Sequence, residues 1–164
     1  MAKQKDTLLD SVVELGVSLI IGYTISRFIR IAVARGESML PTIKHNQPML
    51  VDCKAYKRRQ PKRHDLVAFK SHQKKGHKMF LKRVIGLPGD TIIIQEGQVY
   101  VNKELLNEPY LKEPMIRTKK LEITVKEGTI FVMGDNRNHS LDSRSKALGL
   151  VDIEEVVGVI KKFK

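Results

Sequence analysis

The sequence has few of the residues that build disulfides, metal clusters and surfaces for stacking nucleic-acid bases. It contains one cysteine, Cys53, which excludes an internal disulfide and is most simply explained as a small filler in a strand. Aromatic residues make up 5% of the chain and tryptophan is absent. The five histidines stand in polar stretches, and no set of His, Cys, Asp and Glu has the spacing of metal ligands. We therefore expect no metal and no cofactor.

Acidic residues are outnumbered by basic ones, 18 against 30, which gives a net charge of +12. A strongly positive surface attracts polyanions, either nucleic acid or an anionic membrane face. Proteins that bind single-stranded nucleic acids stack bases on aromatic side chains, and these are scarce in the sequence. We therefore expect a lipid bilayer or wall polymer as the partner, and no specific nucleic acid.

Long hydrophobic runs are also rare, because only one stretch lacks charge for more than ten positions, residues 15–26. A membrane span needs about 20 residues. The stretch reaches that length, over residues 11–34, if Glu14, Arg27 and Arg30 lie near its ends, where long side chains reach the polar interface. The pattern predicts a short polar tip and an N-terminal membrane anchor within residues 1–34.

Two alternatives to this anchor stay open. A buried or surface-lying amphipathic helix is one of them. A cleaved signal peptide is the other, because Ala32-Val33-Ala34 has the small-x-small form of a cleavage site, although Arg27 and Arg30 just before it argue against cleavage. Basic residues flank the stretch on both sides, so charge alone does not set its orientation.

The remainder of the chain, residues 35–164, has the pattern of a β domain. Short apolar runs alternate with turn signals such as Gly86–Asp90, and Glu96-Gly97 predicts a hairpin. The predicted strands cover 49–53, 66–69, 79–85, 91–95, 98–102, 121–125, 129–133 and 156–160. Residues 71–78 read as a polar turn, 103–120 as an irregular excursion and 134–149 as a polar loop. We expect a mainly β fold, a coiled antiparallel sheet or barrel-like domain with one N-terminal anchor helix.

A lysine lies on an apolar strand face within this domain. In an extended strand over 79–85, the side chains of Phe80, Lys82 and Val84 point to the same side. Such a lysine usually extends its ammonium to water, but full burial lowers the pKa by as much as 3–5 units. A neutral amine can take a proton from a serine hydroxyl, and Ser–Lys is a known variant of the nucleophile-and-base pair. Ser38, between Gly36 and Pro41, is the candidate nucleophile.

The late loop, residues 134–144, is rich in side chains that hydrogen-bond to one another. Its mixture of acids, arginines, Asn and Ser suits a rigid turn network, and it predicts an ion pair between Asp142 and Arg144. A rigid loop of this kind can hold Ser140 beside a buried amine. No Ser-His-Asp arrangement stands out in the sequence.

Four ordered stretches resemble the conserved boxes of type I signal peptidases, of the short Gram-positive kind. The stretches are Gly36–Thr42, Asp65–Val67, Lys82–Asp90 and the late loop from Gly134 to Arg144. The resemblance runs from about residue 11 to about residue 160. It implies a membrane-bound serine endopeptidase that removes N-terminal signal peptides from exported precursors, with its N-terminus cytoplasmic and its catalytic domain outside the cell membrane.

The resemblance also implies a role for each matching residue. Ser38 matches the nucleophile, with its backbone N–H in the oxyanion hole, and Lys82 matches the general base. Ser140 matches the hydroxyl that orients the lysine, while Asp142 and Arg144 match the pair that stiffens the site. Some relatives have a serine hydroxyl two places before the nucleophile, where this chain has Gly36 and no side-chain donor.

By the same resemblance, the substrate has small residues at the first and third positions before the scissile bond. An extended peptide would add to the strand at residues 81–83, so that backbone bonds supply affinity and shallow pockets select small side chains. Met39 and Leu81 are the expected pocket walls. Two alternatives remain open, a Ser–Lys self-cleaving regulator and a catalytically inactive membrane-anchored paralogue.

Overall fold

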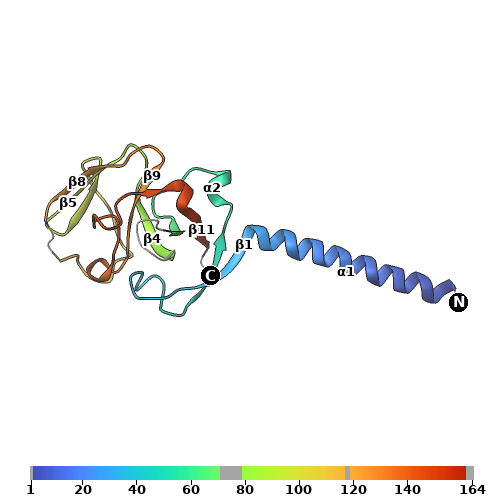
Figure 1. Ribbon diagram of the computed structural model, residues 1–164. Helices are drawn as coiled ribbons and strands as arrows, with labels where there is room; N and C mark the ends of the chain where they lie inside the picture. The colour runs from blue at the N-terminus through green and yellow to red at the C-terminus, as the bar shows by residue number, and fades with distance from the viewer. Residues whose placement is uncertain (1, 71–78, 117–118, 162–164) are drawn as a thin grey trace.

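The computed structural model describes residues 2–70, 79–116 and 119–161. One long helix projects from a β-rich body (Figure 1). The elements are α1 (Ala2–Phe28), β1 (Ile29–Val33), β2 (Pro48–Asp52), α2 (Ala55–Arg58), β3 (Leu66–Lys70), β4 (Met79–Gly86), β5 (Thr91–Gln95), β6 (Gln98–Val101), β7 (Glu104–Leu105), β8 (Leu121–Thr124), β9 (Thr129–Met133), η1 (Arg137–His139), β10 (Val151–Asp152), η2 (Ile153–Glu155) and β11 (Val156–Lys161).

The helix α1 continues directly into strand β1. The predicted helical anchor over 11–34 is therefore too long at its C-terminal end, because α1 ends at Phe28. The next five residues are mostly β-branched or small and pair with β2, from Ile29 opposite Asp52 to Val33 opposite Pro48. None of the helices in the described ranges combines the length and the hydrophobicity that a bilayer crossing requires.

The larger sheet has seven antiparallel strands in the order β1-β2-β11-β3-β4-β9-β10. Its first and last strands lie at opposite edges and do not pair with each other, so the sheet is open. The expectation of a mainly β antiparallel fold is confirmed, but the barrel-like form is wrong. Closure would require a long β10 in register with β1, and β10 has two residues.

The smaller sheet has four strands in the order β7-β6-β5-β8. The predicted hairpin at Glu96-Gly97 joins β5 to β6, and both residues have positive φ, 52° and 80°, as a tight two-residue turn requires. An apolar cluster that includes Ile92, Val99 and Phe131 fills the space between this sheet and β9. The smaller sheet therefore packs against the end of the larger sheet that carries the late loop.

The predicted strands are all present, with ends that differ by at most one residue. The sequence interpretation missed three short or edge strands, β1, β7 and β10, and the single-turn helix α2 inside the basic stretch after residue 53. The predicted polar turn at 71–78 lies outside the described residues.

Candidate active site

Ser38 lies in a tight loop between β1 and β2. Gly36, two positions earlier, has φ +96°, a left-handed conformation that glycine adopts with least strain. The loop is then closed by turn bonds, in which Leu40 N–H donates to Glu37 O at 3.1 Å and Ile43 N–H donates to Met39 O at 2.9 Å. These bonds fix the backbone on both sides of the serine.

Lys82 lies on β4, a central strand that pairs with β3 on one side and with β9 on the other. Its side chain is almost fully buried, with 3% exposure. Its Nζ hydrogen-bonds to Ser38 Oγ at 2.6 Å and donates to the Leu81 carbonyl at 3.0 Å. The fold thus joins two residues that are 44 positions apart in the chain.

Burial changes the acidity of this amine. Loss of solvation lowers the pKa of Lys82 from 10.5 to about 8, although the negative charges of Asp142 and Asp135 oppose this shift. Neither carboxylate forms an ion pair with Lys82 in the described part of the chain, because each is held by an arginine. A substantial fraction of Lys82 is therefore neutral near pH 8, and a neutral amine can act as a base.

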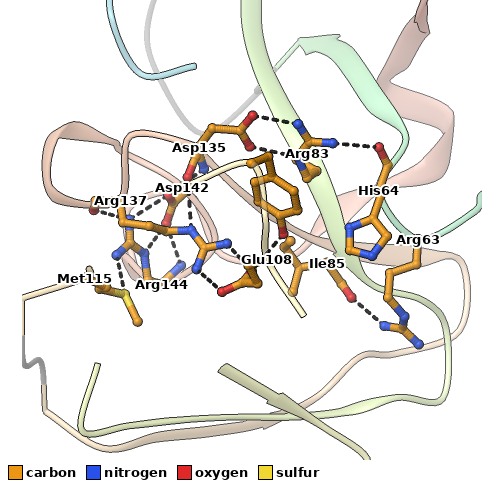
Figure 2. Close-up of polar contacts among 12 residues, drawn as sticks. Arg63, His64, Arg83, Ile85, Glu108, Met115, Asp135, Arg137, Asp142 and Arg144 are labelled. Atoms are coloured by element: carbon orange, nitrogen blue, oxygen red, sulfur yellow. Dashed lines mark hydrogen bonds and ion pairs between the residues drawn. The ribbon is translucent and has the colours of Figure 1, made fainter. Parts of the chain in front are cut away.

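The ion pair predicted between Asp142 and Arg144 is present (Figure 2). Nε and an Nη of Arg144 donate to the two oxygens of Asp142, each at 2.8 Å, and Arg144 also donates to the Arg137 carbonyl at 2.7 Å. The same carboxylate accepts the Gly134 N–H at 3.0 Å. These bonds tie the late loop to the end of β9.

Ser140 lies in this loop beside the serine at position 38. A Cβ placed on Gly134 would overlap the Ser140 side chain and come within 2.6 Å of the Ser38 carbonyl, so the three residues pack closely. The Ser140 hydroxyl is buried and has no hydrogen-bond partner among the described residues. The bond to Lys82 that the sequence predicts is therefore not formed, and the orienting role stays a prediction.

A cleft of about 520 Å³ opens beside Ser38 and Lys82. Met39 and Leu81, the predicted pocket walls, both line it. The lining also includes Ala32-Val33-Ala34, which the sequence presented only as a small-x-small cleavage motif. The cleft is lined mainly by apolar side chains.

The sequence interpretation missed an ion pair on the other side of β4. Arg83 donates to both oxygens of Asp135, at 2.8 and 2.6 Å (Figure 2). Its guanidinium carbon lies 3.9 Å from the centre of the Tyr110 ring. The next residue, Asn136, donates its N–H to the Ser38 carbonyl at 3.0 Å. The only sequence signal for this arrangement was an arginine within an apolar strand.

A second missed ion pair joins Arg137 to Glu108. The guanidinium binds both carboxylate oxygens, and its side chain has 1% exposure (Figure 2). Glu108 lies in the irregular segment predicted over residues 103–120, so this ion pair connects that segment to the late loop. Within the described residues, no group of three His, Cys, Asp or Glu side chains is arranged to hold a metal ion.

Comparison with known proteins gives a consistent result. The family described as "Signal peptidase, peptidase S26" matches residues 8–163. Signal peptidase I P of Bacillus subtilis subsp. natto is 35% identical over 167 residues, covering 96% of this chain and 89% of the relative. Signal peptidase IB of Staphylococcus aureus (strain Mu50) is 30% identical over 174 residues, covering 95% and 88%.

The fold is also similar to a solved structure. The crystal structure of a signal peptidase I from Enterococcus faecalis V583 superposes with a TM-score of 0.54 and 35% sequence identity. The match covers 63% of this chain and 98% of that one.

Proposed function

Because this chain belongs to the signal peptidase family of S26 peptidases, we propose that it is a serine endopeptidase that removes signal peptides from exported precursors. The observation that carries the proposal is the 2.6 Å contact between Ser38 Oγ and a buried amine, Lys82 Nζ, in an apolar cleft. Ser38 is the proposed nucleophile and Lys82 the proposed general base.

The reaction follows from these two groups. Neutral Lys82 takes the proton from Ser38 Oγ as the oxygen attacks the scissile carbonyl carbon, which gives a tetrahedral intermediate. The resulting ammonium then protonates the leaving amine, the C–N bond breaks, and the signal peptide remains as an ester on Ser38. Lys82, neutral again, takes a proton from water, whose oxygen attacks the ester. The second intermediate then collapses as the Lys82 ammonium returns this proton to Ser38 Oγ, which releases the acid and regenerates Ser38 and neutral Lys82.

The backbone N–H of Ser38 is the proposed donor to the oxyanion. Removing one such donor costs roughly 3–4 kcal/mol of transition-state stabilisation in other serine peptidases. Gly36 supplies no side-chain donor, and its φ of +96° explains why a residue with a Cβ is disfavoured there. The precise turn between residues 36 and 43 is therefore part of the proposed catalytic machinery.

Three further residues are proposed to position the pair. Asp142 and Arg144 hold the late loop rigid through the ion pair described above. Ser140, whose buried hydroxyl is unpartnered and packs beside Gly134, can orient the Lys82 amine when Ser38 Oγ leaves it to attack the substrate.

The substrate is proposed to bind as an added strand. β9 pairs with β4 only from Arg83 onward, so residues 79–82 have one edge without a paired strand in the described part of the chain. A peptide in the cleft can hydrogen-bond to this edge. Met39 and Leu81 then bound the space for small side chains before the scissile bond.

We also propose that α1 anchors the protein in a membrane, with residues 1–28 as tip and anchor and the β body that begins at β1 as the extracytoplasmic catalytic domain. The support is that α1 projects from the body (Figure 1) and leaves large apolar side chains uncovered, among them Val12, Leu15 and Ile20, each more than 60% exposed. Apolar surface of this extent indicates a lipid or protein partner.

A cleavage assay in detergent tests the proposed function. The full chain is incubated with a precursor that carries a small-x-small site, and wild type is compared with Ser38→Ala and Lys82→Ala. Both variants should lose cleavage while circular dichroism shows unchanged folding. Cleavage at the wild-type rate by either folded variant would refute the assignment.

A further inference from the structure

We propose that a basic hollow, where α1 meets the β body, binds the phosphate headgroup of an anionic phospholipid. The hollow is lined by Tyr23, Arg27, Arg30, Cys53, Lys54, Lys57 and Val157. This inference rests on the proposed membrane attachment through α1, but it concerns a surface that is separate from the Ser38 cleft.

Four cations converge on the hollow, and its lining contains no carboxylate. In the described ranges, none of Arg27, Arg30, Lys54 and Lys57 forms an ion pair. The neighbouring cations behave differently, because Arg58 and Lys161 share the Asp52 carboxylate at 2.5 and 3.5 Å. The half-charge of the α1 C-terminus offsets only part of the positive charge. An anion in the hollow would relieve the remaining repulsion.

The walls of the hollow are fixed by backbone bonds. The Phe28 carbonyl, at the end of α1, accepts the Cys53 N–H at 2.8 Å. Arg30 lies on β1 opposite Val51 of β2. The cations therefore come from three segments that are already held together, so that binding an anion orders little of the chain.

The position of the hollow favours a lipid as the source of the phosphate. Tyr23 lies in the lining, one turn of helix before Arg27, and its ring is 5.9 Å from that guanidinium carbon. The apolar, exposed side chains of α1 precede this point. Tyrosine beside basic residues at the end of an apolar helix is the pattern found at headgroup depth in membranes.

A titration with a short-chain lipid tests the proposal. Dihexanoyl phosphatidylglycerol, below its micelle concentration, is added to the detergent-solubilised full chain, and backbone amide NMR shifts are followed. We expect saturable shifts at Cys53, Lys54 and Val157, with phosphatidylcholine binding at least about tenfold more weakly. Added salt should weaken the binding further.

A matched pair of variants makes the test specific. Arg30→Gln/Lys54→Gln/Lys57→Gln removes three charges from the hollow, whereas Lys62→Gln/Lys103→Gln/Lys126→Gln removes three exposed charges elsewhere. The first variant should bind phosphatidylglycerol about tenfold or more weakly, and the second should bind it as wild type does. Thermal unfolding checks that both variants are folded. If the variant of the hollow is unfolded, the location of the wild-type NMR shifts still tests the proposal.

Three results would overturn the proposal. One is equal binding of phosphatidylglycerol by the two variants. Another is inorganic phosphate that binds as tightly as phosphatidylglycerol, which indicates an anion site without lipid specificity. The third is displacement of the lipid by a lower concentration of single-stranded oligonucleotide. The lipid titration can be repeated with Ser38→Ala protein, because it does not depend on peptidase activity. Failure of the lipid proposal is therefore distinguishable from failure of the proposed function.

Discussion

Lys82 and Arg83 are neighbours on β4 and are almost equally buried, with exposures of 3% and 7%, yet their surroundings differ. Lys82 contacts a serine hydroxyl and a backbone carbonyl. Arg83 binds both oxygens of the Asp135 carboxylate and stacks on Tyr110. One cation therefore has only neutral partners, and the other has a full counter-charge.

The difference shows how two buried cations on the same strand are accommodated. A guanidinium does not lose its proton in proteins, so a buried arginine needs a carboxylate. A lysine can lose its proton instead, and burial lowers the pKa of Lys82 to about 8. Asp135 and Asp142 are near this amine, but each is paired with an arginine, and Arg144 itself lowers the pKa of Lys82. The ion pairs thus keep nearby carboxylates from holding the lysine in its charged form.

The largest expected effect comes from replacing the lysine with an apolar residue of similar length. Lys82→Met should reduce kcat/KM for a precursor peptide by at least about 10⁴-fold, because no base remains near Ser38 Oγ. The folded protein should be as stable at pH 7 or more stable, by up to about 3 kcal/mol, because a costly buried cation is removed. Urea denaturation and the peptide assay measure the two effects. A large loss of stability would show that Lys82 has a structural counter-charge.

For Arg83, the neighbour of Lys82 on β4, a loss of stability is expected. Arg83→Met should reduce the free energy of unfolding by about 3–5 kcal/mol, because Asp135 is left as a buried carboxylate without a partner. Urea denaturation gives this value. The control is Arg83→Met/Asp135→Leu, which removes both charges and should regain much of the lost stability. If the double variant is no more stable than the single one, the ion pair is not the reason for the loss.

The pH dependence of cleavage distinguishes the two cations in the intact protein. Only neutral Lys82 can act as a base, so kcat/KM should fall about tenfold for each pH unit below its pKa of about 8, and level off above it. A soluble peptide substrate, assayed from pH 6 to 10, gives the profile. A flat profile below pH 8 would contradict a lysine base.

The free energy of unfolding should also depend on the titration of Lys82, and it should increase as the pH rises. The pKa of Lys82 is lower in the folded chain than in the unfolded chain, so the penalty for burying its charge is complete below pH 8. Raising the pH from 8 to 10.5 should remove this penalty, roughly 3 kcal/mol. The difference in unfolding free energy between wild type and Lys82→Met should therefore shrink over this range.

The smallest expected effect concerns the buried hydroxyl of Ser140, which packs beside Gly134. Ser140→Ala should leave stability unchanged within about 1 kcal/mol, because the hydroxyl has no bond to lose. It should lower kcat about tenfold if the hydroxyl orients Lys82 during turnover, with little change in KM. Ser140→Thr, which restores a hydroxyl, is the matched control. Unchanged kcat in the alanine variant would remove Ser140 from the mechanism.

The sequence predicted the parts of the site that depend on local pattern. Alternation over residues 79–85 placed Lys82 on an apolar face, and the mixture of acids and arginines in the late loop suggested the ion pair of Asp142 and Arg144. The partner of Arg83 is 52 positions away and is brought there by the register in which Arg83 lies opposite Met133. A register between distant strands is set by tertiary packing, and no local signal in one sequence indicates it.

The fold, too, was predicted from the sequence where local signals are clear and missed where pairing between distant strands decides the conformation. The strands with clear alternation and turn signals were predicted to within one residue, and the Glu96-Gly97 hairpin was predicted from its turn residues. Strand β1 was assigned to the helix because the apolar pattern of α1 continues into it without a turn signal. Its strand conformation comes from pairing with β2, which lies 15 or more positions later.

The direct passage of α1 into β1 has a consequence for which bonds in a precursor can be reached. Ser38 follows Phe28 by ten positions, so the attacking oxygen lies at most about 35 Å from the end of the helix. Five of those positions are held in an extended, paired strand, which leaves the spacer little freedom to lengthen or shorten. If α1 is fixed in a bilayer and Ser38 is the nucleophile, as proposed, the short spacer sets the height of the site above the lipid. Scissile bonds would then be selected by that height as well as by the size of the residues that precede them.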